Sequence, residues 1–250
     1  MKKISLTIFD LSGTTVSDDN SVARCLYEGA RHFGLNTTIS DFEKTIGTNK
    51  IHLYEFMLAR DLGEKVSIEN LEQYSFPQYH EKAMEIFRHY SILMIDYYRR
   101  KVKAMQGAEE TFQWCHNNGI KVVTDTGFHR DVNEAIMEGL QWKERGLIDF
   151  SLDVEDTGGI GRPAPYMIFK AMQLTGVQSV HEVLKIGDTP ADLLSGYNAG
   201  CSLNIGVLSG ANSKATLCLY PHTHLINSVA DLPDLISNEL NDRHSSIETA

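Results

Sequence analysis

The chain has 250 residues, of which 42% are hydrophobic and 22% charged, and its formal net charge at pH 7 is -10. This length is sufficient for a buried core and lies at the upper edge of one domain, or of a domain with a large insert. The acidic balance and the lack of a basic stripe exclude nucleic acid as an expected partner. A phosphate ligand would need local positive charge or a metal ion to offset that acidity.

Cysteine usage and hydropathy favour a cytoplasmic protein. The four cysteines form no C-x-x-C pair and lie in apolar-patterned segments, which predicts reduced core thiols. The N-terminal "MKKISLTIFD" has too short an apolar run for a signal peptide, and no stretch approaches a membrane span. We therefore expect a cytoplasmic location and no membrane partner.

The first expected strand, "LTIFD" at 6–10, ends in Asp10 and runs into a Gly13-Thr14-Thr15 turn. A carboxylate at that place can be a nucleophile that accepts a phosphoryl group. It can equally be a polar residue that starts a turn, which is the commoner role of an Asp before a Gly turn. This stretch alone leaves both interpretations open.

Residues 18–99 differ from the rest of the chain, because they carry helical periodicity and no strand pattern. We interpret this block as an all-helical cap domain inserted after the first strand. The remaining segments, 1–17 and 100–250, then form one core domain. The expected cap helices fall at 21–33, 49–60 and 68–96.

From about residue 100, short apolar strands alternate with amphipathic helices, which predicts an α/β fold with a doubly wound parallel sheet and a Rossmann-like core. Ligands of such sheets bind beyond the carboxyl ends of the strands. The polar tail at 241–250 is expected to fray. The expected strands are 120–127, 147–154, 182–189, 201–207 and 223–228, and the expected helices are 108–117, 129–141, 164–175, 190–199 and 231–240.

The segment "KIGDTPADLLSG" places Asp188 after a strand and Asp192 in the first turn of a helix. Together with Asp10 they could form an oxygen-rich site for a hard cation, most simply Mg²⁺. The alternative is a helix N-terminus with favourably placed negative charge. The motif alone does not decide between them.

Two further stretches could contact an anion. Arg162, in "GGIGRPAP", offers a planar fork to phosphate oxygens, although a solvated surface arginine is the commoner case. Thr124 and Thr126, in "VVTDTGF", end a strand, and their hydroxyls and neighbouring amides could cradle an anion or merely cap the next helix.

Taken together and in this order, Asp10, Thr124, Arg162 and Asp188 resemble the four motifs of the haloacid dehalogenase superfamily. The resemblance implies Mg²⁺-dependent hydrolysis through an aspartyl-phosphate on Asp10, beneath a helical cap. It further implies two sets of residues. The metal ligands would be Asp10, Asp188, Asp192 and the backbone carbonyl of Ser12, and the substrate contacts would be Ser12, Gly13, Thr124, Asp125, Thr126, Gly127 and Arg162, including the amides at 13–14 and 125–127.

Two departures from the commonest pattern resemble one branch, that of phosphonoacetaldehyde hydrolase (phosphonatase). Ser12 stands where most phosphatases have a second Asp, and the basic residue is Arg162 in G-R-P-x-P. That branch has a cap lysine that forms an imine with the substrate aldehyde. Gly47 and Lys50 of "IGTNKIHLYEF" match its motif, although the Asp-His pair that follows in the branch is missing.

The resemblance implies that Lys50 acts catalytically beside Asp10 and Arg162, provided its pKa is lowered from roughly 10.4. The alternative for Lys50 is a solvated lysine on a cap helix. We expect a small phosphonate or phosphorylated substrate, with a phosphomonoesterase and a non-catalytic phosphate-binding protein as the alternatives. Whether the chain forms a homodimer stays open.

Overall fold

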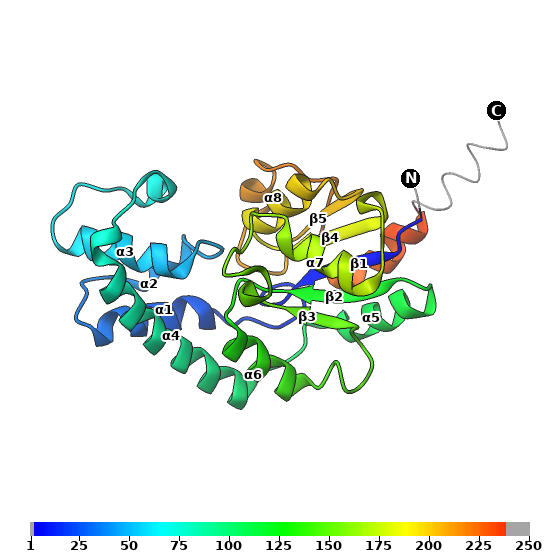
Figure 1. Ribbon diagram of the computed structural model, residues 1–250, viewed down its shortest axis with the longest axis horizontal. Helices are drawn as coiled ribbons and strands as arrows, with labels where there is room; N and C mark the ends of the chain where they lie inside the picture. Colours follow the sequence, from blue (N-terminus) through cyan, green and yellow to red (C-terminus); the bar gives the residue numbers. More distant parts are fainter. Residues whose placement is uncertain (1–2, 239–250) are drawn as a thin grey trace.

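The computed structural model describes residues 3–238, in which six parallel strands form one sheet beside a group of helices (Figure 1). The spatial order is β3-β2-β1-β4-β5-β6, so the first strand lies in the middle of the sheet. The doubly wound core is thus confirmed. The strands are β1 (Leu6–Asp10), β2 (Lys121–Asp125), β3 (Phe150–Leu152), β4 (Val183–Gly187), β5 (Leu203–Val207) and β6 (His224–Ile226).

Both faces of the sheet are buried, which is why its strands are nearly continuous apolar runs. Leu6 and Ile8 of β1 point to one face, where they pack with Met167 and Ile168 of α7 (Tyr166–Thr175). Phe9 points to the opposite face and lies in the larger core cluster. The period-2 alternation of a strand therefore divides β1 between two cores.

The core helices follow the expected positions closely. They are α5 (Ala108–Asn117), α6 (Arg130–Leu140), α7, α8 (Pro190–Ala199) and the short α9 (Lys214–Leu217), which the sequence pattern did not indicate. Residues 232–238 are helical, while the end of the expected helix at 231–240 and the tail at 241–250 lie outside the described residues.

Between β1 and α5 the chain is helical. Its α-helices are α1 (Ser21–His32), α2 (Ile39–Glu43), α3 (Lys50–Asp61) and α4 (His80–Lys101). The single helix expected at 68–96 is wrong: two 3-10 turns, Ile68–Gln73 and Pro77–Tyr79, precede α4. The physical reason is Pro77, because a proline disfavours helical geometry at the preceding residue, here Phe76.

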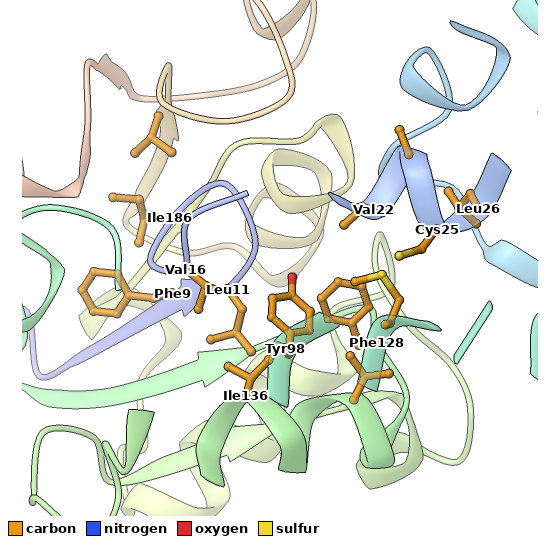
Figure 2. Close-up of a cluster of buried hydrophobic side chains, with 14 of the residues drawn as sticks. Phe9, Leu11, Val16, Val22, Cys25, Leu26, Tyr98, Phe128, Ile136 and Ile186 are labelled. Atoms are coloured by element: carbon orange, nitrogen blue, oxygen red, sulfur yellow. The ribbon is translucent and has the colours of Figure 1, made fainter. Parts of the chain in front are cut away.

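The helical segment and the sheet share one apolar cluster (Figure 2). Tyr98, near the end of α4, lies among Leu11, Phe128 and Ile136 at the centre of that cluster. Helix α4 also packs along α6, which anchors the helical segment to the core. Within residues 3–238, no helix combines the length and the apolar character needed to cross a membrane.

Candidate active site

The carboxyl ends of the central strands bring the expected acidic residues to one edge of the sheet. Asp10 and Asp125 end β1 and β2 and are direct neighbours in the strand register. Asp188 comes directly after β4, the other neighbour of β1. All three side chains are buried. In this strand order, the order reverses between β1 and β4. A doubly wound sheet binds its ligand at that point, beyond the carboxyl ends of the strands.

Arg162 lies at the centre of a buried network of charges. Its Nη1 is 2.7 Å from Asp10 Oδ1 and 3.6 Å from Asp125 Oδ1, and it also donates a hydrogen bond to Asp192 Oδ1. The side chain of Arg162 is only 11% exposed, so this residue is not the solvated surface arginine of the alternative interpretation. The network holds the guanidinium directly against the candidate nucleophile.

Lys185 completes the network and was not identified from the sequence. It is fully buried on β4, with Nζ 2.7 Å from Asp125 Oδ1 and 2.8 Å from Asp192 Oδ1. A signal was present: a lysine in the middle of "VLKIG", a strand with apolar neighbours on both sides, must find a buried partner because an unpaired buried charge is very costly. Lys185 thereby fixes two of the three carboxylates that contact Arg162.

The network gives its carboxyl groups different proton affinities. Burial raises the pKa of Asp10 to about 6, although the positive charge of Arg162 acts in the opposite direction. Burial also opposes the charge of Asp192, but Arg162 and Lys185 prevail and lower its pKa to about 2. Asp192 is therefore a permanent anion that anchors the two cations.

Asp188 is held by a hydroxyl and an amide. Thr14 Oγ1 donates to its Oδ1 at 3.1 Å, and the Ala211 N–H donates to its Oδ2 at 2.7 Å. Burial, together with the negative charges of Asp10 and Asp192, raises the pKa of Asp188 well above its usual value. Its environment is thus short of positive charge.

Gly13 serves the turn rather than a ligand. Its φ of +87° favours glycine, and a Cβ there would lie 2.6 Å from Asp188 Oδ2. Its N–H donates to the Val16 carbonyl, and the Thr14 N–H donates to the Leu11 carbonyl. The expectation that the amides at 13–14 contact a phosphoryl group is therefore not supported, because the turn itself uses both.

A cavity of about 500 Å³ opens at this edge and extends to the helical segment. Its walls come from the loops after β1 and β2, from the loop that contains Arg162, and from the segment that leads into α3. The lining residues that the sequence had singled out are Asp10, Ser12, Lys50, Thr126, Gly127 and Arg162. The cavity thus joins residues from opposite ends of the sequence.

The structure places Thr124 and Asp125 away from this cavity. The Thr124 hydroxyl donates to Ser151 Oγ at 2.8 Å, inside the sheet, and Asp125 is engaged with Lys185. Neither residue lines the cavity, whereas Thr126 and Gly127 do. Thr124 lies within β2 and Thr126 follows its last residue, so the threonine that lines the cavity is the one just beyond the strand end.

Lys50 is the first residue of α3 and lines the cavity with Asp10 and Arg162. Its Nζ donates to the Thr48 carbonyl at 2.9 Å, and within residues 3–238 it forms no salt bridge. Burial, and then the positive charge of Arg162, lower the pKa of Lys50 to about 8, although Asp10 acts in the opposite direction. A solvated cap lysine is not what the structure shows.

The loop before Lys50 rests on the core. Gly47 has a φ of +99°, and a Cβ on it would lie 3.3 Å from Thr189 Cβ. Thr189 in turn donates a hydrogen bond to Asp192 Oδ2 at 2.6 Å. Gly47, in the segment that leads to Lys50, therefore lies against Thr189. Thr189 in turn holds Asp192, which binds Arg162.

Ser12 lines the cavity at the position where a general acid was expected to be missing. Its Oγ accepts a hydrogen bond of 3.3 Å from the Tyr98 hydroxyl. Burial raises the pKa of Tyr98, so that phenol stays protonated. Neither hydroxyl is a strong acid at neutral pH.

The buried carboxylates can supply ligands to a divalent cation. Oxygens of Asp10, Asp125 and Asp192 lie within 4.8 Å of one another, and oxygen donors of this kind suit hard cations. Both oxygens of Asp192 already bind Arg162, Lys185 or Thr189. Together with Asp188, the buried carboxyl groups outnumber the two cations, Arg162 and Lys185. This balance of charges favours the binding of a further cation.

Curated relatives carry one recurring name. A phosphonoacetaldehyde hydrolase of Parabacteroides distasonis is 28% identical over 218 residues, which cover 85% of this chain and 79% of that protein. A phosphonoacetaldehyde hydrolase of Bacillus cereus is 28% identical over 217 residues, covering 84% of this chain and 78% of its own length.

Solved structures share the fold. A phosphonoacetaldehyde hydrolase-like protein from Oleispira antarctica matches with a TM-score of 0.72 and 20% identity, covering 94% of this chain and 92% of that one. A hydrolase from Pseudomonas syringae matches with a TM-score of 0.76 and 18% identity, over 94% and 98% of the two chains. Residues 4–200 match the family model described as haloacid dehalogenase-like hydrolase. The chain belongs to the haloacid dehalogenase-like hydrolase family and is an enzyme of that type.

Proposed function

We propose that this protein hydrolyses the carbon–phosphorus bond of a small phosphonate that carries an aldehyde, of the phosphonoacetaldehyde type. One observation carries the proposal: Lys50, a lysine with a lowered pKa, lines the same cavity as the Asp10 carboxylate and the Arg162 guanidinium. The two relatives named above are phosphonoacetaldehyde hydrolases, which supports the same substrate class.

The amine solves the leaving-group problem of this reaction. Breaking a carbon–phosphorus bond leaves an electron pair on carbon, which is unfavourable unless the pair can delocalise. The neutral amine of Lys50 adds to the aldehyde, and loss of water together with uptake of one proton from solvent gives an iminium ion. When the carbon–phosphorus bond breaks, its electron pair moves onto that nitrogen and an enamine results.

Asp10 is the proposed nucleophile toward phosphorus. One of its oxygens forms the new bond to phosphorus as the bond to carbon breaks, and water later hydrolyses the aspartyl-phosphate. Arg162, held 2.7 Å from Asp10, is placed to bind the oxygens of the transferred group. No oxygen leaving group needs a proton, which agrees with Ser12 at the position of the usual acid.

We further propose that the cation is Mg²⁺, held by Asp10, Asp188 and the backbone carbonyl of Ser12. Its bound charge would neutralise phosphoryl oxygens and screen the approach of Asp10 to an anionic substrate. Asp192, first expected as a ligand, instead anchors Arg162 and Lys185, because these cations occupy Oδ1 and Thr189 occupies Oδ2.

The segment at 18–99 is proposed to act as a cap domain on the core formed by 1–17 and 100–250. Support comes from the cavity, whose walls include residues of both parts, such as Lys50 and Asp10. Closure of such a cap would exclude bulk water from the iminium ion and the aspartyl-phosphate.

Trapping with borohydride tests the proposal directly. With phosphonoacetaldehyde present, borohydride should reduce the iminium ion and add the two-carbon fragment covalently to Lys50. Lys50→Met should remove both labelling and turnover, whereas the exposed Lys65→Met serves as the matched control and should change neither.

Two outcomes would replace the proposal. Release of phosphate from esters that survives Lys50→Met but is lost in Asp10→Asn would indicate a phosphomonoesterase. No phosphate release from phosphonates or esters, with or without Mg²⁺, would favour a phosphate-binding protein.

A further inference from the structure

His129 is a cavity residue to which the proposed reaction gives no role. It precedes the first turn of α6, directly after the Thr126-Gly127-Phe128 loop, and it lines the cavity together with Asp10 and Lys50. The ring of Phe87, from α4, packs on it with a centroid distance of 4.6 Å. His129 therefore lies where the helical segment meets the loop after β2.

Glu155 fixes the orientation of this ring. Its Oε1 is 2.5 Å from His129 Nδ1, and its Oε2 accepts a hydrogen bond of 3.1 Å from the Arg130 backbone N–H. The guanidinium of Arg130 is turned away, toward Asp153 and Asp156. The carboxylate is thus held at both oxygens, one by the helix start and one by the imidazole.

This pairing determines which nitrogen is available. A carboxylate can only accept, so Nδ1 must carry a hydrogen and donate it to Glu155. Within residues 3–238, the His129 ring makes hydrogen bonds only through Nδ1. Nε2 is then the nitrogen that can hold or release a proton.

The other candidate for proton transfer lies elsewhere. His52, two residues after Lys50, binds the Leu71 carbonyl through Nε2 and lies 3.7 Å from Glu55 through Nδ1. It does not line the cavity. Ser12 and Tyr98 reach each other but are poor acids at neutral pH. Among the histidines of the described residues, only His129 lines the cavity.

We propose that His129, oriented by Glu155, is the catalytic acid that protonates the enamine carbon after the carbon–phosphorus bond breaks. The inference rests on the function proposed above. The imidazolium transfers its Nε2 proton to the terminal carbon of the enamine, and the nitrogen lone pair restores the iminium ion on Lys50. Water then adds to the iminium carbon and returns a proton to Nε2, so that acetaldehyde leaves and the amine and imidazolium are regenerated.

Substitution of His129 by Asn removes the proposed proton donor but keeps a side chain that can hydrogen-bond to Glu155. The Asn amide keeps an N–H donor for Glu155 but cannot act as a general acid near neutral pH. With phosphonoacetaldehyde as substrate, we expect kcat to fall by about 10²-fold with KM and the melting temperature nearly unchanged. Borohydride should still label Lys50, because the iminium ion forms before this step.

A matched control is available in α5. His116 also pairs with a carboxylate, since its Nε2 is 3.2 Å from Asp149, but it does not line the cavity. His116→Asn should leave kcat unchanged. In His129→Ala, free imidazole should enter the vacated space beside Phe87 and restore part of the lost rate, which a structural role of His129 would not permit.

Glu155 is a positioning residue, and its test is a double substitution. Glu155→Gln keeps an oxygen for the Arg130 N–H but replaces the carboxylate that accepts from His129 Nδ1 with a neutral amide. We expect kcat to fall with KM nearly unchanged, and we expect Glu155→Gln to cause no further loss in the His129→Asn background.

The outcomes separate the two proposals. If the wild type neither turns over phosphonoacetaldehyde nor becomes labelled at Lys50, the proposed function fails and the role of His129 fails with it. If the wild type is labelled and His129→Asn retains full kcat, only the inference is overturned. Loss of kcat without rescue by imidazole, accompanied by a lower melting temperature, also overturns it and assigns His129 to packing.

Discussion

The pKa of the cationic side chain is raised on one side of the cavity and lowered on the other. On the sheet side, Arg162 contacts Asp10, Asp125 and Asp192, and these carboxylates raise its pKa even though burial opposes its charge. On the helical side, Lys50 has a backbone carbonyl as its hydrogen-bond partner, and its pKa is lowered to about 8.

The difference teaches how one site can hold a permanent cation beside a reactive amine. Carboxylates around a guanidinium keep it charged, which suits the binding of phosphoryl oxygens. A lysine deprived of such partners and placed near that guanidinium becomes a nucleophile. The charge of Arg162 therefore has two effects, since it attracts the anionic substrate and favours the neutral form of Lys50.

The largest expected effect is loss of the nucleophile on the sheet side. Asp10→Asn keeps the size of the side chain but removes the attacking charge, so we expect phosphate release to fall by at least about 10⁴-fold. The measurement is steady-state phosphate release, with the melting temperature as a check on folding. Retention of more than a tenth of the activity would contradict the role of Asp10.

The second effect concerns stability and tests whether the sheet side is fixed by its own charges. Lys185→Met removes the partner of two buried carboxylates, Asp125 and Asp192, and should lower the free energy of unfolding by about 3–5 kcal/mol. Denaturant unfolding measures it. Lys121→Met removes a half-exposed partner of Asp149 and should change the same quantity by less than about 1 kcal/mol.

Equal losses of unfolding free energy in Lys185→Met and Lys121→Met would mean that burial does not make the ion pairs of Lys185 more stabilising than that of Lys121. A loss confined to Lys185→Met would show that the buried carboxylates depend for stability on a residue that does not line the cavity.

The third effect is the pH dependence of the helical side. Lys50 must be neutral to attack the aldehyde, and its pKa of about 8 leaves roughly a tenth of it neutral at pH 7. The rate of iminium formation should therefore rise nearly tenfold per pH unit up to about 8 and then level off. Borohydride labelling at fixed times measures that rate. A rate that continues to rise up to pH 10 would show an unperturbed lysine.

The smallest effect is expected where the two sides touch. Gly47→Ala places a methyl group against Thr189 in a backbone conformation that favours glycine, and should lower kcat/KM by about tenfold through displacement of Lys50. Gly63→Ala is the matched control, because Gly63 has a similar φ of +92° but no neighbour within 4 Å. Equal effects of the two substitutions would attribute the loss to backbone strain alone.

The sequence predicted the parallel core and singled out Asp10, Arg162, Asp188 and Lys50 as site residues. Strand ends and the order of motifs can be recognised along the chain without knowledge of tertiary contacts. The sequence could not tell Thr124 from Thr126, because the choice depends on where β2 ends: Thr124 lies inside the strand and bonds to Ser151, and Thr126 lies beyond it. The pairing of Asp125 with Lys185 joins residues 60 positions apart and depends on register between strands that are not sequence neighbours.

The irregular stretch at 68–79 was missed for a different reason. Its apolar spacing suits a helix, but Pro77 interrupts the hydrogen-bond pattern and α4 begins only at His80. His129 and Glu155 were missed because they are 26 positions apart and neither belongs to a recognised motif; a histidine directly after a strand-end loop was the available signal.

Helix α4 has 22 residues, and Tyr98 near one end is embedded in the core while Phe87 lies three turns away on His129. At 1.5 Å per residue the two rings are separated along the axis by roughly 16 Å, so a tilt of about 10° about Tyr98 would shift Phe87 by ~3 Å. A rotation of that size, barely visible at Tyr98, would separate Phe87 from the His129 ring, two groups that the packing of α4 along α6 holds together.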